Sequence, residues 1–229
     1  MDPHQQAYLG ISIQVSLSGY SFKVHSPAGV EASGWMGADR LFTTPEFQRR
    51  YDAVEVSLLT PKVALVPEAF YTPSQARAAL SEVVSLEDTD FVETVAVPSL
   101  GSVLLFSNSI GESLSKVLAQ TVLPASGTPV RVLPEMYYLL RELEHLTEYN
   151  KIVASWYDSH LHLVVAQGRS LCLANVFDAP DFTTAQYFIF LAMKRLQLNP
   201  EVSTLCFRTP ISQEAELSLY RYFKAVVQL

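Results

Sequence analysis

The sequence predicts an α/β fold built from two related lobes. A pattern of strand, turn, strand, turn, strand and helix occupies residues 151–198, and a weaker copy of the same order opens the chain. Each copy predicts a three-stranded meander followed by a helix, with further strands and helices alternating after it. We place the boundary between the lobes near residue 150, which gives an N-terminal lobe over 1–149, with inserted elements, and a C-terminal lobe over 150–229.

The second copy has the clearer signals. Strands are predicted at 151–157, 160–166 and 171–177, because β-branched and aromatic residues dominate these segments. Asp158-Ser159 and Gln167-Gly168-Arg169 supply the two turns between them. The strand 160–166 alternates Leu161, Leu163 and Val165 with His160, His162 and Val164. This period of two predicts a hairpin with one firmly buried face.

A helix and a returning strand complete the second copy. The helix spans about 184–198 and is apolar nearly all round, so we expect it to be buried on more than one side. Asn199-Pro200 ends it, and 202–207 is predicted as a strand that rejoins the sheet. A crossover of this kind usually makes a parallel, right-handed connection.

The first copy opens with an equally regular hairpin. Apolar and polar residues alternate over 11–16 and again over 20–25, with Ser18-Gly19 at the turn. A third strand is predicted over 30–36, although glycines interrupt it. Thr44-Pro45 then predicts a helix that opens at proline and carries Phe47 and Tyr51.

The remaining elements alternate between strand and helix. In chain order we predict strands at 54–59 and 62–66, a helix at 74–84, strands at 91–97 and 101–108, a helix at 111–122, a strand at 130–133, a helix at 135–146 and a last helix at 213–227. The helix 135–146 carries an apolar stripe that is wider than one face. We interpret the stripe as buried between the lobes, and alternatively as covered by another chain.

Composition and charge limit the classes of function that the sequence allows. A hydrophobic content of 49% with 17% charged residues is typical of a globular chain, and the net charge of −7 without a basic stripe argues against nucleic-acid binding. The sequence shows no signal peptide pattern and no apolar stretch long enough for a membrane span. A cytoplasmic protein is therefore expected. Cys172 and Cys206 both fall in predicted strands, which favours buried free thiols over a disulfide or a metal pair.

Four short segments carry a resemblance to a known family. They are LGISIQVSLSGYSFKV in the first hairpin, Asn-Val-Phe after the third strand, TTAQYFIFLAMKRLQL in the apolar helix and LYRYFKAV near the end. These segments resemble the bacterial family known as domain of unknown function 3822. That family resembles the actin-like ATPases of the ribonuclease H-like superfamily, including PilM-like proteins. The resemblance implies two ribonuclease H-like lobes.

The resemblance also implies where a phosphate site would lie. In actin-like ATPases the first hairpin turn carries Asp-x-Gly, because the carboxylate organises Mg²⁺ and the glycine lets backbone amides approach phosphate. Here that turn is Ser16-Leu17-Ser18-Gly19, which has no carboxylate. The equivalent turn of the second lobe has Asp158, but Ser159 follows it instead of glycine. ATP hydrolysis is therefore not expected, and neither is a cofactor. A nuclease of this superfamily is excluded too, since residues 11–16 hold no acidic metal ligand.

Other residue combinations have weaker chemical meaning. His160 and His162 share a strand face near Cys172, but no third ligand of matching kind accompanies them, so we interpret a partly exposed histidine face and expect no metal. Asp158, Ser159 and His160 have the residue types of a hydrolase triad, yet triad members converge from separate segments. The glycine-flanked turn 34–37 is interpreted as structural.

Two functions from different classes remain from the sequence. The first is a degenerate, non-hydrolytic actin-like protein that acts as a binding or scaffold partner for another protein. A protein can keep the fold without the ATPase activity, because function depends on the site and not on the fold. The alternative is a nucleotide-binding, ATPase-like enzyme with a non-standard phosphate site at the inter-lobe cleft, formed by Ser16, Ser18 and Asp158. A small-molecule binding module in the same cleft is a third possibility that the sequence does not separate from the first.

Overall fold

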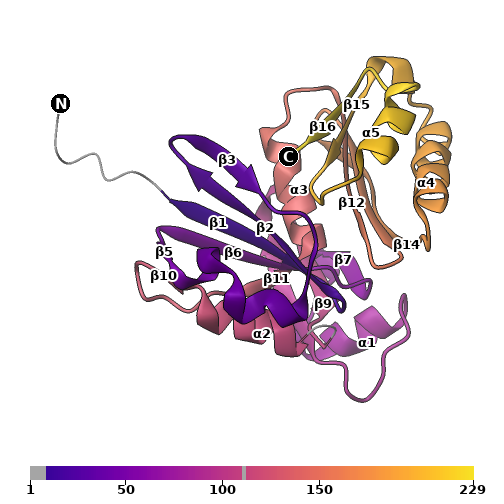
Figure 1. The fold of residues 1–229 in the computed structure, drawn as a ribbon. Helices are drawn as coiled ribbons and strands as arrows, with labels where there is room; N and C mark the ends of the chain where they lie inside the picture. The colour runs from indigo at the N-terminus through magenta and orange to yellow at the C-terminus, as the bar shows by residue number, and fades with distance from the viewer. Residues whose placement is uncertain (1–8, 110–111) are drawn as a thin grey trace, which may run out of the picture. The chain divides into compact units, whose positions relative to one another are not determined.

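A computed structural model describes residues 9–109 and 112–229 (Figure 1). The described chain divides into two compact units. Unit 1 comprises residues up to 58 together with the segment that ends at 133, and unit 2 comprises 59–109 and 134–229. The predicted lobe boundary at residues 149 and 150 lies inside unit 2, so contacts within the chain do not mark it, and it stays a prediction.

Unit 1 is built on one mixed sheet. Its strands are β1 (Gly10–Val15), β2 (Gly19–Ser26), β3 (Gly29–Ala32), β4 (Met36–Gly37), β6 (Ala53–Leu58) and β11 (Val132–Pro134). The order is β11-β6-β1-β2-β3, with β4 paired to β2. β1 runs antiparallel to β2 and parallel to β6. The predicted first hairpin is therefore confirmed.

The alternating residues of that hairpin form the core of unit 1. Ile11, Ile13, Tyr20 and Phe22 are buried on one side of the sheet. They pack with further apolar residues of the unit, including Leu118 from helix α2 (Glu112–Thr121). The predicted helix at 111–122 is confirmed over its described part, and Gly111 lies outside the described residues.

Two expectations for unit 1 are wrong in detail. The third strand is split into β3 and β4, which are separated by residues 33–35. No α-helix follows Pro45: two 3₁₀-helices, η1 (Ala38–Thr43) and η2 (Pro45–Gln48), lead into strand β5 (Arg50–Tyr51). β5 pairs in parallel with β10 (Leu123–Pro124). Residues 50 and 51 therefore pair with another strand and do not continue a helix.

Unit 2 contains a five-stranded sheet. Its strands are β12 (Asn150–Tyr157), β13 (His160–Gln167), β14 (Ser170–Asp178), β15 (Thr204–Phe207) and β16 (Ala225–Gln228), in the order β14-β13-β12-β15-β16. The predicted meander is confirmed by the antiparallel pairs β12–β13 and β13–β14. Helix α4 (Phe182–Arg195) connects β14 to β15, which runs parallel to β12 as expected for the crossover.

The end of the chain differs from the prediction. Helix α5 (Gln213–Tyr220) stops seven residues before the predicted end at 227. Residues 225–228 form β16 instead, which pairs in parallel with β15 and buries Val226. β-branched residues fit a pleated strand better than a helix, so the adjacent valines at 226 and 227 favour this outcome.

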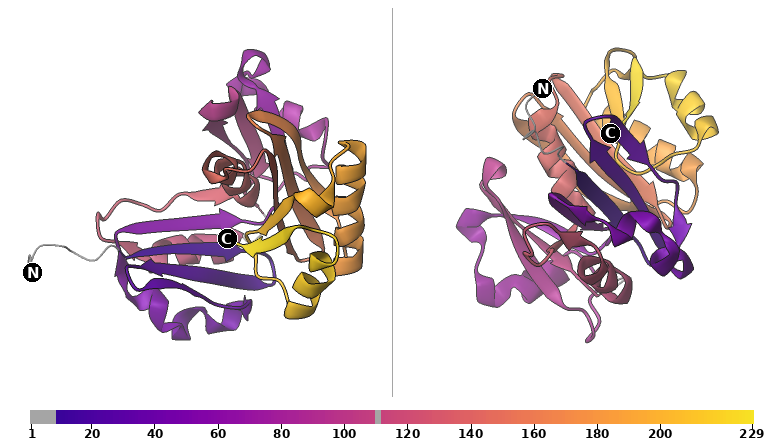
Figure 2. Two further views of the ribbon diagram at one scale, coloured as in Figure 1. Left: turned by 90° about the horizontal axis from the view of Figure 1, so that it is seen from above. Right: turned by 60° about the vertical axis from the view of Figure 1, so that its left-hand side comes forward.

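Helices cover both faces of the unit 2 sheet. Ile152, Leu163 and Leu205 share one core cluster with Ile189 of α4 and Leu219 of α5. Helix α3 (Glu135–His145) packs on β12 and β13. Of its predicted apolar stripe, Tyr138, Leu139, Leu140 and Leu143 are buried, and Tyr137 and Leu146 are half-buried. The two further views of Figure 2 show α4 and α3 on opposite sides of these strands.

A second, smaller sheet belongs to unit 2. It has the antiparallel order β7-β9-β8, with β7 (Val63–Pro67), β9 (Ser102–Ser107) and β8 (Val92–Val97). Helix α1 (Ala76–Ser81) is shorter than the predicted 74–84, because a 3₁₀-turn, η4 (Pro73–Gln75), precedes it. Further 3₁₀-turns are η3 (Glu68–Phe70), η5 (Pro98–Leu100) and η6 (Pro200–Val202). Within the described residues, no helix has the length and apolar character to cross a bilayer.

Candidate functional site

The first hairpin turn is closed by its own hydrogen bonds. Ser16 is buried, and its backbone N–H donates to the carbonyl of Gly19 at 2.9 Å. The Ser16 hydroxyl donates to the same carbonyl at 3.3 Å and accepts from the backbone N–H of Ser18 at 3.3 Å. The Ser16 and Ser18 hydroxyls lie 3.4 Å apart. The structure thus brings two of the three predicted phosphate-site residues together, but the Ser16 hydroxyl is already used within the turn.

Gly19 is required in this turn for a different reason from phosphate binding. A Cβ atom at Gly19 would lie 2.1 Å from the backbone oxygen of Met36, since β4 pairs directly with Gly19 and Tyr20 of β2. The absent side chain therefore makes room for a neighbouring strand. The turn also has no carboxylate to organise a metal ion. These residues do not fit a Mg²⁺–phosphate site of the actin-like type.

The second hairpin turn holds Asp158, the third predicted residue. Asp158 and Ser159 have φ values of 48° and 63°, so both adopt the left-handed conformation of a tight hairpin turn. Such positions favour glycine, and aspartate is among the residues that tolerate them. The carbonyl of Ser159 accepts a hydrogen bond from the N–H of Ala179 at 2.7 Å. Asp158 belongs to unit 2, whereas Ser16 and Ser18 belong to unit 1.

A buried charged cluster lies under helix α3 and was not predicted. The Glu135 carboxylate accepts from Arg208 Nη1 through Oε2 at 2.6 Å and from the Ser155 hydroxyl through Oε1 at 2.6 Å. The Arg208 guanidinium also stacks over the Tyr138 ring, 4.6 Å from its centroid, and lies 3.9 Å from the Glu142 carboxylate. Glu135 and Arg208 are 73 residues apart in sequence, and no local pattern distinguishes them from surface charges.

His162 is the unusual member of this region. It is fully buried on β13, directly opposite Ser155 of β12, and neither ring nitrogen has a hydrogen-bond partner among the described residues. Burial lowers the pKa of His162 to about 4, although the Glu135 carboxylate opposes this shift. The ring is therefore neutral at pH 7. The predicted partly exposed histidine face is wrong at this position, because α3 covers it.

The structure does not assemble the other combinations of the sequence. His160 lies 3.7 Å from the Asp178 carboxylate on β14, and within the described residues no group of three metal-binding side chains occurs. Cys172 is half-buried and points its sulfur at the Ser170 carbonyl, 3.5 Å away, so the expected burial is wrong for this thiol. Cys206 is buried as expected, and burial raises its pKa to about 11.

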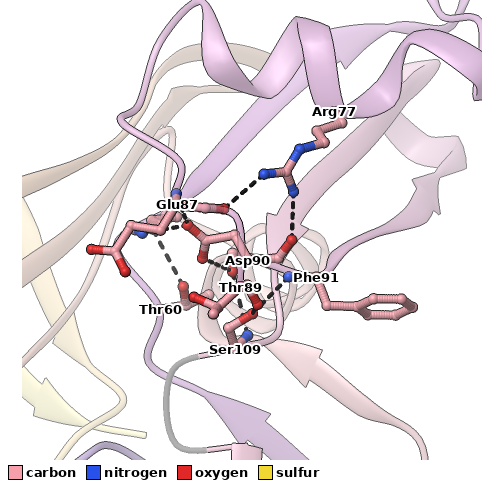
Figure 3. A network of polar contacts seen from close by, with 9 residues as sticks. Thr60, Arg77, Glu87, Thr89, Asp90, Phe91 and Ser109 are labelled. Atoms are coloured by element: carbon pink, nitrogen blue, oxygen red, sulfur yellow. Dashed lines mark hydrogen bonds and ion pairs between the residues drawn. The ribbon is translucent and has the colours of Figure 1, made fainter.

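A second buried carboxylate organises the smaller sheet (Figure 3). Asp90 accepts from Lys62 Nζ at 2.6 Å, from the Ser107 hydroxyl at 2.5 Å and from the N–H of Glu87 at 2.7 Å. Burial alone would raise the pKa of Asp90, but these hydrogen bonds lower it to about 2. Arg77 donates to the backbone carbonyls of Asp90 and Glu87 at 2.5 and 2.7 Å. The loop before β8 is thus held in place by charged hydrogen bonds.

The same network presents an aromatic side chain. The N–H of Phe91 donates to the Ser109 hydroxyl at 2.6 Å, and that hydroxyl donates to the Thr89 carbonyl at 2.9 Å. Figure 3 shows the Phe91 ring directed away from the network. Its side chain is 64% exposed. Phe91 is therefore a large, exposed apolar side chain on a backbone that is held by hydrogen bonds.

Comparison with protein families identifies the chain. The family described as "Protein of unknown function (DUF3822)" matches residues 1–226. The chain belongs to this family. No curated protein matches it.

Solved structures place this DUF3822 member in a known fold. It resembles a Bacteroides thetaiotaomicron protein with an actin-like ATPase fold and unknown function, at a TM-score of 0.69 and 16% identity, over 100% of this chain and 93% of that chain. It also resembles a chain of the PilM–PilN type IV pilus biogenesis complex, at a TM-score of 0.52 and 13% identity, over 96% and 88% of the two chains. The DUF3822 member thus has the actin-like ATPase fold that its sequence predicts.

Proposed function

We propose that this protein is a degenerate, non-hydrolytic member of the actin-like fold that acts in the cytoplasm as a binding or scaffold partner of another protein. The closed turn from Ser16 to Gly19 carries this proposal. A phosphate site needs donors that point outward and a charge that holds the metal. Here the Ser16 hydroxyl is satisfied inside the turn, and the space beside Gly19 is taken by the Met36 carbonyl.

The fold supports a role in protein binding. One solved relative, PilM, is described in a complex with PilN. Protein interfaces depend on a few large, well-anchored side chains, with aromatic residues prominent among them. Phe91 meets this description, because its backbone is fixed by Ser109 and the Asp90 network while its ring is exposed. We propose that Phe91 is part of the partner-binding surface.

A site-specific photo-crosslinker tests this surface. The photoreactive amino acid p-benzoylphenylalanine replaces Phe91 in one variant and Phe42, a 72% exposed residue of unit 1, in a matched control. After irradiation in the producing cells, we expect one discrete crosslinked protein from position 91 and none from position 42. Discrete crosslinks from neither position, or the same ones from both, would contradict a role for Phe91.

The nucleotide-binding alternative makes a separate prediction. If Ser16, Ser18 and Asp158 bind ATP through a non-standard site, the protein binds ATP saturably and Asp158→Ala abolishes that binding. An Asp158→Ala variant that keeps the wild-type affinity would exclude this alternative. Absence of ATP binding in the wild-type protein supports the non-hydrolytic proposal.

A further inference from the structure

Unit 2 contains a pocket at the end of its meander that lies farthest from Asp158. β12 and β13 pair from Tyr157 and His160 at the Asp158 end to Asn150 and Gln167 at the other, and the pocket opens at this second end. Its volume is about 350 Å³, which lies within the range of small-molecule sites. The lining comprises Ser99, Leu100, Leu140, Leu143, Glu144, Lys151, Ala166, Gly168, Arg169 and Leu171.

Half of the lining residues are apolar, and we call this part of the lining the floor of the pocket. Ala166 and Leu171 face each other across β13 and β14, and Leu140 and Leu143 come from helix α3. Leu140, Leu143 and Ala166 are buried in the chain itself. This floor favours an aliphatic or aromatic group of the ligand, because the group leaves water on entering.

Both signs of charge line the pocket. Lys151 is half-buried, and Arg169 is exposed on the turn between β13 and β14. Arg169 has no hydrogen-bond or ion-pair partner among residues 9–109 and 112–229, so its donors are available to a ligand carboxylate. Glu144 supplies a negative charge from the last turn of α3.

The end of helix α3 adds to the negative side. Lys151 Nζ donates to the Leu143 carbonyl at 2.5 Å, which places its charge against the carbonyl end of the helix. The C-terminal end of a helix carries a partial negative charge equivalent to about half an electron. The two cations are therefore largely balanced by Glu144 and the helix end, and the pocket favours a ligand with both charges over a simple anion.

We propose that this pocket binds a free amino acid with an apolar side chain. Arg169 and Lys151 take the α-carboxylate, Glu144 takes the α-ammonium group, and the leucine-lined floor takes the side chain. This arrangement uses both signs of charge and the apolar floor of the lining, whereas a fatty acid has no cationic group for Glu144. The site is independent of the proposed protein partner, since none of its residues belongs to the Asp90 network.

Three probes that share one apolar group test the charge pattern. Isothermal titration measures L-leucine, 4-methylpentanoate, which lacks the ammonium group, and 3-methylbutylamine, which lacks the carboxylate. We expect saturable binding of leucine, and at least about tenfold weaker binding of each of the other two, because each has lost a charged hydrogen bond. No saturable binding of leucine, or 4-methylpentanoate binding as tightly as leucine, would overturn the proposal.

Single variants then assign each charge. Arg169→Gln should weaken leucine and 4-methylpentanoate about tenfold and leave 3-methylbutylamine unchanged, whereas Glu144→Gln should weaken leucine and 3-methylbutylamine only. Both residues are exposed, so the fold is retained. Arg195→Gln is the matched control, because Arg195 is an exposed arginine on α4, outside the pocket lining. Equal effects of Arg169→Gln and Arg195→Gln, or an Arg169→Gln variant with wild-type leucine affinity, would overturn the assignment.

Discussion

Glu135 and Arg208 form an ion pair with a separation of 2.6 Å in the interior of unit 2, where the Glu135 side chain is fully buried. Helix α3 supplies the carboxylate, and the residue directly after β15 supplies the guanidinium. The pair joins the helix to the sheet that it covers. A buried pair of this kind is costly to break, because removal of one partner leaves the other charge without compensation.

We therefore expect Glu135→Ala to lower the free energy of unfolding by about 3–5 kcal/mol in urea denaturation. The double variant Glu135→Leu with Arg208→Met should recover most of that loss, since two apolar side chains replace the pair. Glu144→Ala is the control from the exposed face of the same helix and should stay within about 0.5 kcal/mol of the wild type. A Glu135→Ala variant as stable as this control would show that the pair contributes nothing.

Replacement of His162 should change how stability depends on pH. The folded-state pKa of about 4 lies below the ordinary 6.5, so the unfolded chain binds a proton first as the pH falls. The titration of His162 therefore leaves the free energy of unfolding unchanged above pH 6.5. It lowers this free energy by on the order of 3 kcal/mol as the pH falls to about 4. His162→Leu removes the loss and the two unpaired nitrogens. Unfolding curves measured from pH 7.5 to 4 should diverge between the two proteins; parallel curves would contradict the burial of a neutral ring.

Asp90 should also lose its stabilising contribution as the pH falls, but in a lower pH range than His162. Its folded-state pKa of about 2 lies below the ordinary 3.8, so its stabilising contribution is present above pH 3.8 and is lost as the pH falls toward 2. Asp90→Asn should cost roughly 2 kcal/mol at pH 6, from charged hydrogen bonds to Lys62 and Ser107, and this cost should shrink by pH 2.5. Asp88→Asn, two residues away and exposed, is the control. A pH-independent cost would mean that the Asp90 charge is not what matters.

Gly19→Ala tests the packing of the first hairpin turn. The added Cβ would lie 2.1 Å from the Met36 carbonyl oxygen, so β4 must move away from β2. We expect a loss of about 2–3 kcal/mol, as for an overpacked core position. Gly34→Ala adds a methyl group with no atom within 4 Å, and it should be close to neutral. Equal stabilities for the two variants, measured by thermal unfolding, would contradict the close pairing of β4.

The sequence predicted secondary structure well where a local periodic pattern reports it. It predicted secondary structure poorly where contacts between distant segments determine it. The alternating residues of 11–16 and 160–166 predicted both hairpins, because a period of two directly reports a half-buried strand. Residues 50–51 and 225–227 were predicted as parts of helices, although pairing with distant strands makes them extended. Local propensity does not contain that information.

The site residues show the same division. Ser16, Ser18 and Asp158 were selected as candidates from a motif position, and the structure places the two serines in one turn. Glu135 and Arg208 were missed, since an acidic residue at a helix start and an arginine after a strand are typical of exposed surfaces. Only the tertiary fold brings them together. The burial of His162 was missed for a related reason, because helix α3 covers a strand face that a single strand pattern leaves open.

Calorimetric titration with ATP and Mg²⁺ tests whether the first hairpin turn can take part in a phosphate site. The closed Ser16–Gly19 turn predicts no saturable heat at millimolar nucleotide, with ADP giving the same result. Saturable binding at micromolar concentration would contradict the account, because it would require phosphate contacts that the first hairpin turn does not offer.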